Sequence, residues 1–257
     1  MDSVYVQIRQ LAQKIASHFP IPDFYQDYAQ ESDLSYQFFE EDPVISRLKS
    51  FVADCIDNDF GHGMNHVAKV TIDAGTLMVI EGRGAGYPND FIHRKVMVLQ
   101  CAGLLHDIKR KEKDHAIKGA DFAREILKDY PLSPEEIDDV CISIRNHEAF
   151  KTTVKTHTAE CALMSDCLYD ADKFRWGPDN FTDTVWEMVS FRDPPPPLSA
   201  FIDHFPSGME GILKIKNTFR TKTGEKYGPQ FIDLGIAIGK ELLDVVKTKF
   251  THQLKRS

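Results

Sequence analysis

Residues 103–115 read GLLHDIKRKEKDH and join an apolar helical run to a dense run of charge. The apolar residues before them predict a helix that is buried in a core. This helix ends in His106 and Asp107, and burying either side chain without a partner costs several kcal/mol. The stretch therefore predicts a helical core in which this pair binds a ligand at a helix end.

Helical periodicity recurs along most of the 257-residue chain. Asp42 followed by Pro43 predicts a helix start, with the proline at the first helical position. Ser133, Pro134 and Glu136 form the pattern of a capping box. Further helices are predicted over residues 62–80, 90–105, 115–131, 157–174, 180–191, 208–220 and 229–250. No run of alternating apolar and polar residues indicates a sheet, so the predicted fold class is all-α.

The composition is that of an ordinary soluble globular protein, with 42% hydrophobic and 27% charged residues. The net charge of -8 argues against general nucleic-acid binding, although a local cluster of cations could still bind a small anionic substrate. No apolar stretch is long enough to span a membrane, and no signal peptide is recognisable. The five cysteines form no C-x-x-C pair. We therefore expect a cytoplasmic protein with reduced thiols and no membrane partner.

Histidines and aspartates gather near the ends of successive predicted helices. In an antiparallel bundle such ends can meet at one place. Imidazole and carboxylate ligands without thiolate suit Mn, Fe, Zn, Co or Ni. The residues concerned are His66, His106, Asp107, His115, His147, Asp170 and Asp172.

Three short motifs resemble, in order, those of the HD superfamily of metal-dependent phosphohydrolases. They are HVAKV at His66, LLHDI at His106 and Asp107, and DADKF over residues 170–174. The resemblance spans about residues 45–190. It implies an HD-domain helical bundle over residues 43–193, between an N-terminal helical extension (1–42) and a C-terminal helical subdomain (194–257) that begins at a tetraproline and packs on the core.

The resemblance implies that one divalent metal ion (Mn, Fe, Zn, Co, Ni or Mg) binds to His66, His106, Asp107 and Asp172. Asp172 is preferred because the family motif is an Ala-Asp followed by a basic and an apolar residue, and Asp170 is the alternative. His62, one turn before His66, is expected next to the metal ligands or on the surface, and not as a ligand itself.

His115 and His147 resemble later histidines of the family. In the two-metal branch, which includes HD-GYP phosphodiesterases and some mixed-valent di-iron oxygenases, such residues bind a second metal. Otherwise they would contact the substrate phosphate or the catalytic water. Asp114 offers an N-cap, so His115 could also simply begin a helix.

The basic run after the HD pair has two interpretations. Lys109 and Lys111, with Arg110 and Lys113, could clamp phosphate oxygens or form a solvated loop. The nucleotidase and pyrophosphohydrolase branches often have an acidic residue shortly after the HD pair, but IKRK follows it here. This departure leaves the substrate open.

The resemblance implies a metal-dependent phosphohydrolase. Metal-activated water would cleave a phosphate ester or pyrophosphate bond of a nucleotide or related phosphorylated metabolite. The alternatives are a di-iron oxygenase on the same scaffold and a non-catalytic metal-binding regulator. Homo-oligomer formation stays open. The predicted roles are catalytic for Asp107 and His115, and substrate-binding for His147, Lys109 and Lys111.

Overall fold

The computed structural model describes residues 3–55, 63–190 and 194–250, and within these ranges it contains helices but no strand. The predicted all-α fold class is confirmed. In chain order the elements are α1 (Ser3–Ala16), α2 (Asp23–Asp27), α3 (Ala29–Glu41), α4 (Pro43–Cys55), α5 (Met64–Gly84), α6 (Asn89–Leu105), α7 (His115–Leu127), α8 (Pro134–Asn146), α9 (Ala159–Phe174), the π-helical turn η1 (Asn180–Thr184), α10 (Val185–Ser190), α11 (Leu198–Ile215) and α12 (Lys222–Lys249).

Two helix starts follow the capping chemistry of the sequence. The Asp42 carboxylate accepts hydrogen bonds from the backbone N–H groups of Val44 (2.8 Å) and Ile45 (3.1 Å) at the start of α4. Ser133 and Glu136 form the reciprocal bonds of a capping box at the start of α8. These side chains satisfy backbone donors that a helix N-terminus leaves without partners, so both predicted starts are confirmed.

The predicted starts of the last two helices are wrong. Helix α11 begins at Leu198 rather than near residue 208, and α12 begins at Lys222 rather than near residue 229. Pro206 and Pro229 lie inside these helices, whereas a proline is normally read as a helix boundary. Tertiary packing of the apolar faces outweighs this local preference.

The cap of α7 also differs from the expectation. Asp114 occupies the N-cap position, but its backbone is left-handed (φ 57°) and its side chain accepts no capping hydrogen bond.

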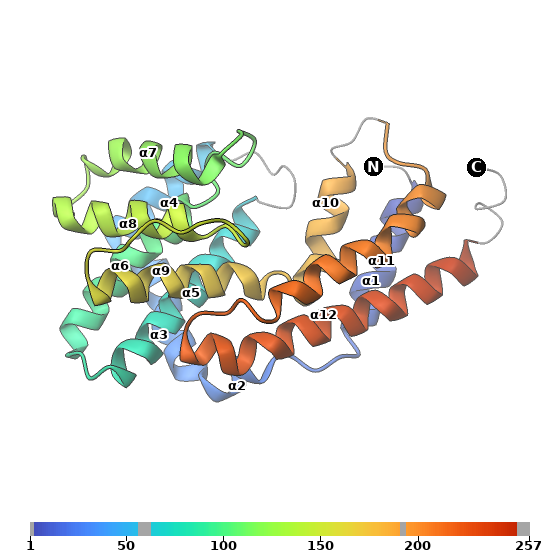
Figure 1. Ribbon diagram of the computed structural model, residues 1–257, viewed down its shortest axis with the longest axis horizontal. Coiled ribbons are helices and arrows are strands. Elements are labelled where there is room, and N and C mark those ends of the chain that lie inside the picture. The colour runs from blue at the N-terminus through green and yellow to red at the C-terminus, as the bar shows by residue number, and fades with distance from the viewer. Residues whose placement is uncertain (1–2, 56–62, 191–193, 251–257) are drawn as a thin grey trace.

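The helices are arranged in two adjoining parts (Figure 1). Helices α3 to α9 form a bundle in which α5 packs against α3, α6 and α9, while α8 packs against α7 and α9. Helices α1, α10, α11 and α12 lie at the other end of the molecule, and the long α12 contacts α1, α9 and α11. Helices from both ends of the described chain therefore pack together; the three-part division of the chain stays a prediction.

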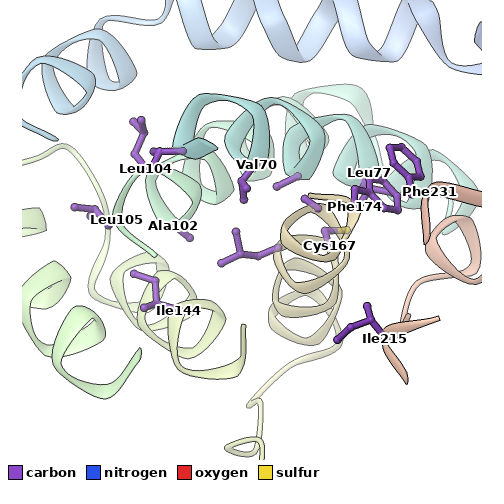
Figure 2. Packing of buried hydrophobic residues seen from close by; sticks show 14 of the residues in the cluster. Val70, Leu77, Ala102, Leu104, Leu105, Ile144, Cys167, Phe174, Ile215 and Phe231 are labelled. Atoms are coloured by element: carbon purple, nitrogen blue, oxygen red, sulfur yellow. The ribbon is translucent and has the colours of Figure 1, made fainter. Parts of the chain in front are cut away.

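Close packing fixes the helices that carry the motif residues. A Cβ atom at Gly103 of α6 would lie 2.8 Å from the Cα atom of Thr71 on α5, so only glycine permits this approach. On the other side of α5, Phe174 of α9 stacks on Phe231 of α12 with ring centroids 4.2 Å apart. Figure 2 shows both aromatic residues beside Leu77 of α5. Helices α5, α6 and α9 thus form a rigid support, as a metal site requires.

Two expectations from the composition can be compared with the structure. All five cysteines are free thiols, and four of them (Cys101, Cys141, Cys161 and Cys167) are buried, whereas Cys55 is exposed. Among the described helices, none combines the length and the hydrophobicity needed to cross a membrane.

Candidate metal centre

Two histidines and two aspartates converge where α5, α6 and α9 meet. His66 Nε2 lies 3.4 Å from Asp172 Oδ1 and 3.9 Å from Asp107 Oδ2. His106 Nε2 lies 3.5 Å from Asp107 Oδ2 and 3.9 Å from Asp172 Oδ1. All four side chains are buried. We call these four residues the ligand cluster; their nitrogen and oxygen atoms face one common position.

The tautomer and the charge of His106 fit a metal ligand. Its Nδ1 donates a hydrogen bond to the carbonyl of Gly103 at 2.7 Å, which leaves the lone pair on Nε2. Burial lowers the pKa of His106 to about 4, so the ring is neutral at pH 7. Within the described residues, its buried Nε2 atom has no hydrogen-bond partner. A neutral imidazole oriented through its other nitrogen is the usual form of a metal ligand.

Asp172 is held in its ionised form by its neighbours. Burial alone would raise its pKa, but the Lys173 ammonium and the nearby histidines hold the pKa well below the usual range for a carboxyl. Lys173 Nζ lies 2.5 Å from Asp172 Oδ2, while Oδ1 faces the two histidines. Lys173 is itself buried and lies over the rings of Tyr169 and Trp176. Its position directly after the motif aspartate was the sequence signal for this residue, but no role was predicted for it.

Asp170 points away from the ligand cluster and binds the start of α12. Its carboxylate accepts hydrogen bonds from the backbone N–H groups of Arg220 (2.9 Å) and Thr221 (2.8 Å) and from the Thr221 hydroxyl (2.8 Å). Thr221 is the N-cap of α12, and a Cβ atom at Gly224 would lie only 2.0 Å from Asp170 Oδ2. Asp170 therefore anchors α12 to α9, and Asp172 is the aspartate that faces His66 and His106.

A second group of side chains shares Asp107 with the ligand cluster. His115 Nε2 and His147 Nε2 each lie 3.5 Å from Asp107 Oδ1 and 3.3 Å from each other. His147 Nδ1 donates to the carbonyl of Ile144 at 2.6 Å, the same arrangement that His106 has. The two carboxylate oxygens of Asp107 thus face two groups that could each hold a cation.

Arg110 brings a positive charge to the second group. Its guanidinium Nη1 donates a hydrogen bond to His115 Nε2 at 2.9 Å and lies 4.0 Å from Asp107 Oδ1. Burial lowers the pKa of His115, so its Nε2 is an acceptor at neutral pH. A metal ion at the second group would have to displace this guanidinium, which is partly exposed and lines the pocket described below.

Other residues of the predicted basic clamp lie elsewhere. Lys109 Nζ lies 4.5 Å from the centroid of the Phe122 ring and 3.5 Å from Glu112, and Lys111 is exposed. Neither residue lines the pocket described next, whereas Arg110 does. His62 falls outside the described residues. Within a run of four cations, the local backbone decides which side chain faces the site, and no sequence pattern distinguishes Arg110 from its neighbours.

A pocket of about 540 Å³ opens over the ligand cluster. One end is polar, and its lining residues are His66, Asp107, Arg110, His147, Glu148, Asp172, Lys173 and Arg175. The other end is apolar and is lined by Trp176, Phe181, Val185, Met188, Phe201, Phe205, Met209 and Ile212. The size is typical of a small-molecule site, for which the range is about 300–1,000 Å³.

The fold and the ligand cluster define an all-helical domain with a candidate site for divalent metal. The family model of the HD domain matches residues 63–176, which contain the whole ligand cluster and the second group. The match is consistent with a protein of the HD superfamily, and the resemblance stated from the motifs is confirmed. Such a domain indicates the superfamily of metal-dependent hydrolases. No curated protein and no solved structure matches the chain.

Proposed function

We propose that this protein is a metal-dependent phosphohydrolase that cleaves a phosphate ester or pyrophosphate bond of a small phosphorylated substrate. The observation that carries the proposal is that the ligand cluster and the cations Arg110 and Lys173 line one pocket, which Arg175 and Glu148 also line. The cluster has the donor set of a divalent-metal site, and the cations match the charge of a phosphoryl group.

The ligand cluster would hold one divalent ion, and its imidazole and carboxylate donors accommodate Mn, Fe, Zn, Co or Ni, with Mg as a further candidate. When bound, such an ion polarises a phosphoryl oxygen and lowers the pKa of water toward about 7. His106 contributes a neutral donor because Gly103 and burial fix its tautomer and charge. Asp107 and Asp172 contribute the negative charge that a divalent ion needs.

The residues of the chain would divide the remaining work. Arg110 and Lys173 bind the phosphoryl oxygens and balance the charge that develops on them. Asp107 Oδ1 orients the attacking water, and the neutral His115 Nε2, 3.5 Å away, accepts its proton. The water oxygen forms the new bond to phosphorus, the bond to the leaving group breaks, and the leaving oxygen takes up a proton. His147, whose Nε2 also lies 3.5 Å from Asp107 Oδ1, hydrogen-bonds the phosphate.

A second candidate function is a di-iron oxygenase on the same scaffold. The convergence of His115 and His147 on Asp107 favours it, because that function needs both histidines as ligands of a second ion. Two iron ions per chain, together with a visible absorption band, would identify it.

A third alternative is a metal-binding regulator without catalysis. Such a protein would hold its metal and hydrolyse none of the phosphate compounds tested below. The cytoplasmic location and the oligomeric state stay predictions.

The first experiment measures phosphate release from nucleotides, sugar phosphates, alkyl phosphates and pyrophosphate by protein loaded with Mn²⁺. We expect Asp107→Ala to lose metal and to reduce the rate by roughly 10³-fold or more, since it removes a ligand and the water-orienting oxygen. Asp121→Ala is the matched control, because Asp121 is an exposed aspartate of the same domain; its rate should equal that of the wild type. Metal-loaded protein that releases phosphate from none of these compounds would contradict the proposal.

A further inference from the structure

The apolar end of the pocket has no role in the proposed chemistry. It extends from the ligand cluster along η1, α10 and α11, and we call it the apolar arm; its residues are Trp176, Phe181, Val185, Met188, Phe201, Phe205, Met209 and Ile212. Asn180, Thr184 and His204 are polar residues that line the same end. Three scattered polar side chains offer few partners for a sugar or another hydroxyl-rich group. The arm is therefore suited to an apolar part of a ligand.

Two exposed apolar side chains stand along this pocket. Phe150 is 66% exposed and Met188 is 45% exposed, although most large apolar side chains of this protein are buried. Phe150 also has a left-handed backbone (φ 62°), a conformation that is unfavourable for an aromatic residue. Backbone strain of this kind is concentrated at ligand-binding and active sites. The strained and exposed Phe150 thus offers apolar surface to a ligand at this edge of the pocket.

The opposite end of the same pocket has the opposite character. Lys173 and Arg110 provide positive charge next to the ligand cluster, within the one continuous cavity of about 540 Å³. A ligand that fills both ends must have an anionic head and an apolar body. We propose that the substrate is amphiphilic: a phosphate ester of an apolar alcohol, with its phosphate at Arg110 and Lys173 and its hydrocarbon part in the apolar arm. This inference rests on the proposed function for the reaction and adds the class of substrate.

Two glycines of α11 allow a matched test. A Cβ atom at Gly208 or at Gly211 would meet no other atom within 4 Å, so a side chain can begin at either position without a close contact. Gly208 lines the pocket and Gly211 does not. Leucine is also a better helix former than glycine, so neither Gly208→Leu nor Gly211→Leu should unfold α11. Only Gly208→Leu places additional volume at the apolar arm.

The test measures binding of alkylphosphonates, which have no ester bond to hydrolyse, to protein loaded with Mn²⁺. Isothermal titration calorimetry with butyl-, hexyl- and octylphosphonate, below the concentrations at which they aggregate, gives Kd for each chain length. We expect Kd to fall about fourfold per buried methylene group, which corresponds to about 0.8 kcal/mol. Gly208→Leu should weaken octylphosphonate binding about tenfold and leave butylphosphonate unchanged, while Gly211→Leu should bind both as the wild type does.

The outcomes separate this inference from the proposed function. Equal Kd values for all three chain lengths, or the same octylphosphonate affinity in Gly208→Leu as in the wild type, would overturn the amphiphilic substrate. Release of phosphate from nucleoside monophosphates as fast as from octyl phosphate would overturn it too, and would leave the phosphohydrolase intact. Tight, chain-length-dependent binding without release of phosphate from octyl phosphate or from any compound of the first experiment would contradict the phosphohydrolase while supporting the apolar arm.

Discussion

The ligand cluster and the apolar arm form two ends of one pocket, but they are built differently. The ligand cluster comes from α5, α6 and α9, lies wholly within residues 63–176, and consists of buried side chains with fixed partners. Apart from Trp176, the apolar arm comes from η1, α10 and α11, beyond the end of the family match. The polar end of the pocket thus lies within the segment that the family model matches, and most of the apolar arm lies in helices that follow it.

The two ends also differ in rigidity. Gly103 brings α5 and α6 close together and its carbonyl orients His106, so the ligand cluster is held by main chain as well as by side chains. The apolar arm instead contains a π-helical turn (Asn180–Thr184) and is edged by the strained Phe150. π-Helical turns are frequent at functional sites, where regular helix packing is interrupted. The ligand cluster therefore lies in regular, closely packed helices, next to a less regular region that lines the apolar arm.

The largest effect is expected when the ligand cluster is broken without changing the shape of a side chain. Asp172→Asn replaces an oxygen that faces His66 and His106, and removes the charge that pairs with Lys173. We expect the metal content to fall well below one ion per chain and the hydrolysis rate to fall roughly 10³-fold. Metal analysis after dialysis and phosphate release measure the two quantities.

Asp170→Asn is the matched variant on the same helix. An amide oxygen cannot replace a carboxylate that accepts three hydrogen bonds from Arg220 and Thr221, so the free energy of unfolding should fall by about 2–3 kcal/mol. The metal content should stay at the wild-type value, because Asp170 does not face the ligand cluster. Urea unfolding and metal analysis test this. Equal loss of metal in both variants would contradict the separate roles of the two aspartates.

The residues of the ligand cluster could be predicted from the sequence because they lie in local patterns. The residues of the apolar arm could not. The capped helices starting at Pro43 and Pro134 and the order of the three motifs are visible in the residues themselves. Asp170 and Asp172 show the limit of local patterns. Two residues that are two positions apart on a helix point about 200° apart, so at most one of these aspartates can face the site. Which one does so depends on the contact of α9 with α12, which is tertiary.

The remaining features depend on tertiary packing in the same way. Arg110 faces the pocket and Lys109 does not, because a turn after α6 directs their side chains differently. The start of α11 was misplaced because Pro206 resembles a boundary, and this hid several residues of the apolar arm. No local motif marks a wall that is assembled from aromatic and aliphatic residues of three separate elements. Such residues look like ordinary core positions until the pocket is seen.

A smaller effect is expected from removing the metal from the intact protein. A ligand that binds only the folded state at a concentration of 100 Kd stabilises it by about 2.7 kcal/mol. For a chain of this size, chelation should therefore lower Tm by roughly 5–10 °C. Differential scanning calorimetry with and without a chelator measures the shift. Asp172→Asn should show almost none, and a full shift in that variant would mean that the metal binds somewhere other than the ligand cluster.

The smallest effect concerns the edge of the apolar arm. A left-handed backbone costs an L-residue about 1–2 kcal/mol, and glycine avoids this cost but gives back about 0.5–1 kcal/mol through its greater freedom when unfolded. Because Phe150 is 66% exposed, removing its side chain sacrifices little buried surface. Phe150→Gly should therefore raise the free energy of unfolding by about 0.5–1 kcal/mol, as measured by urea unfolding of the metal-free protein.

The same variant should make the pocket a poorer site for apolar ligands. We expect Phe150→Gly to weaken octylphosphonate binding by roughly threefold to tenfold, since a single aromatic contact is worth about 0.5–1.5 kcal/mol. Ile117→Ala is the control, because Ile117 is an exposed apolar residue (48%) that does not line the pocket. A more stable protein with weaker binding would mean that the strained backbone of Phe150 holds its side chain in contact with the ligand. A less stable protein with unchanged binding would mean that Phe150 stabilises the fold and does not contact the ligand. Met188 would then be the exposed apolar residue that contacts it.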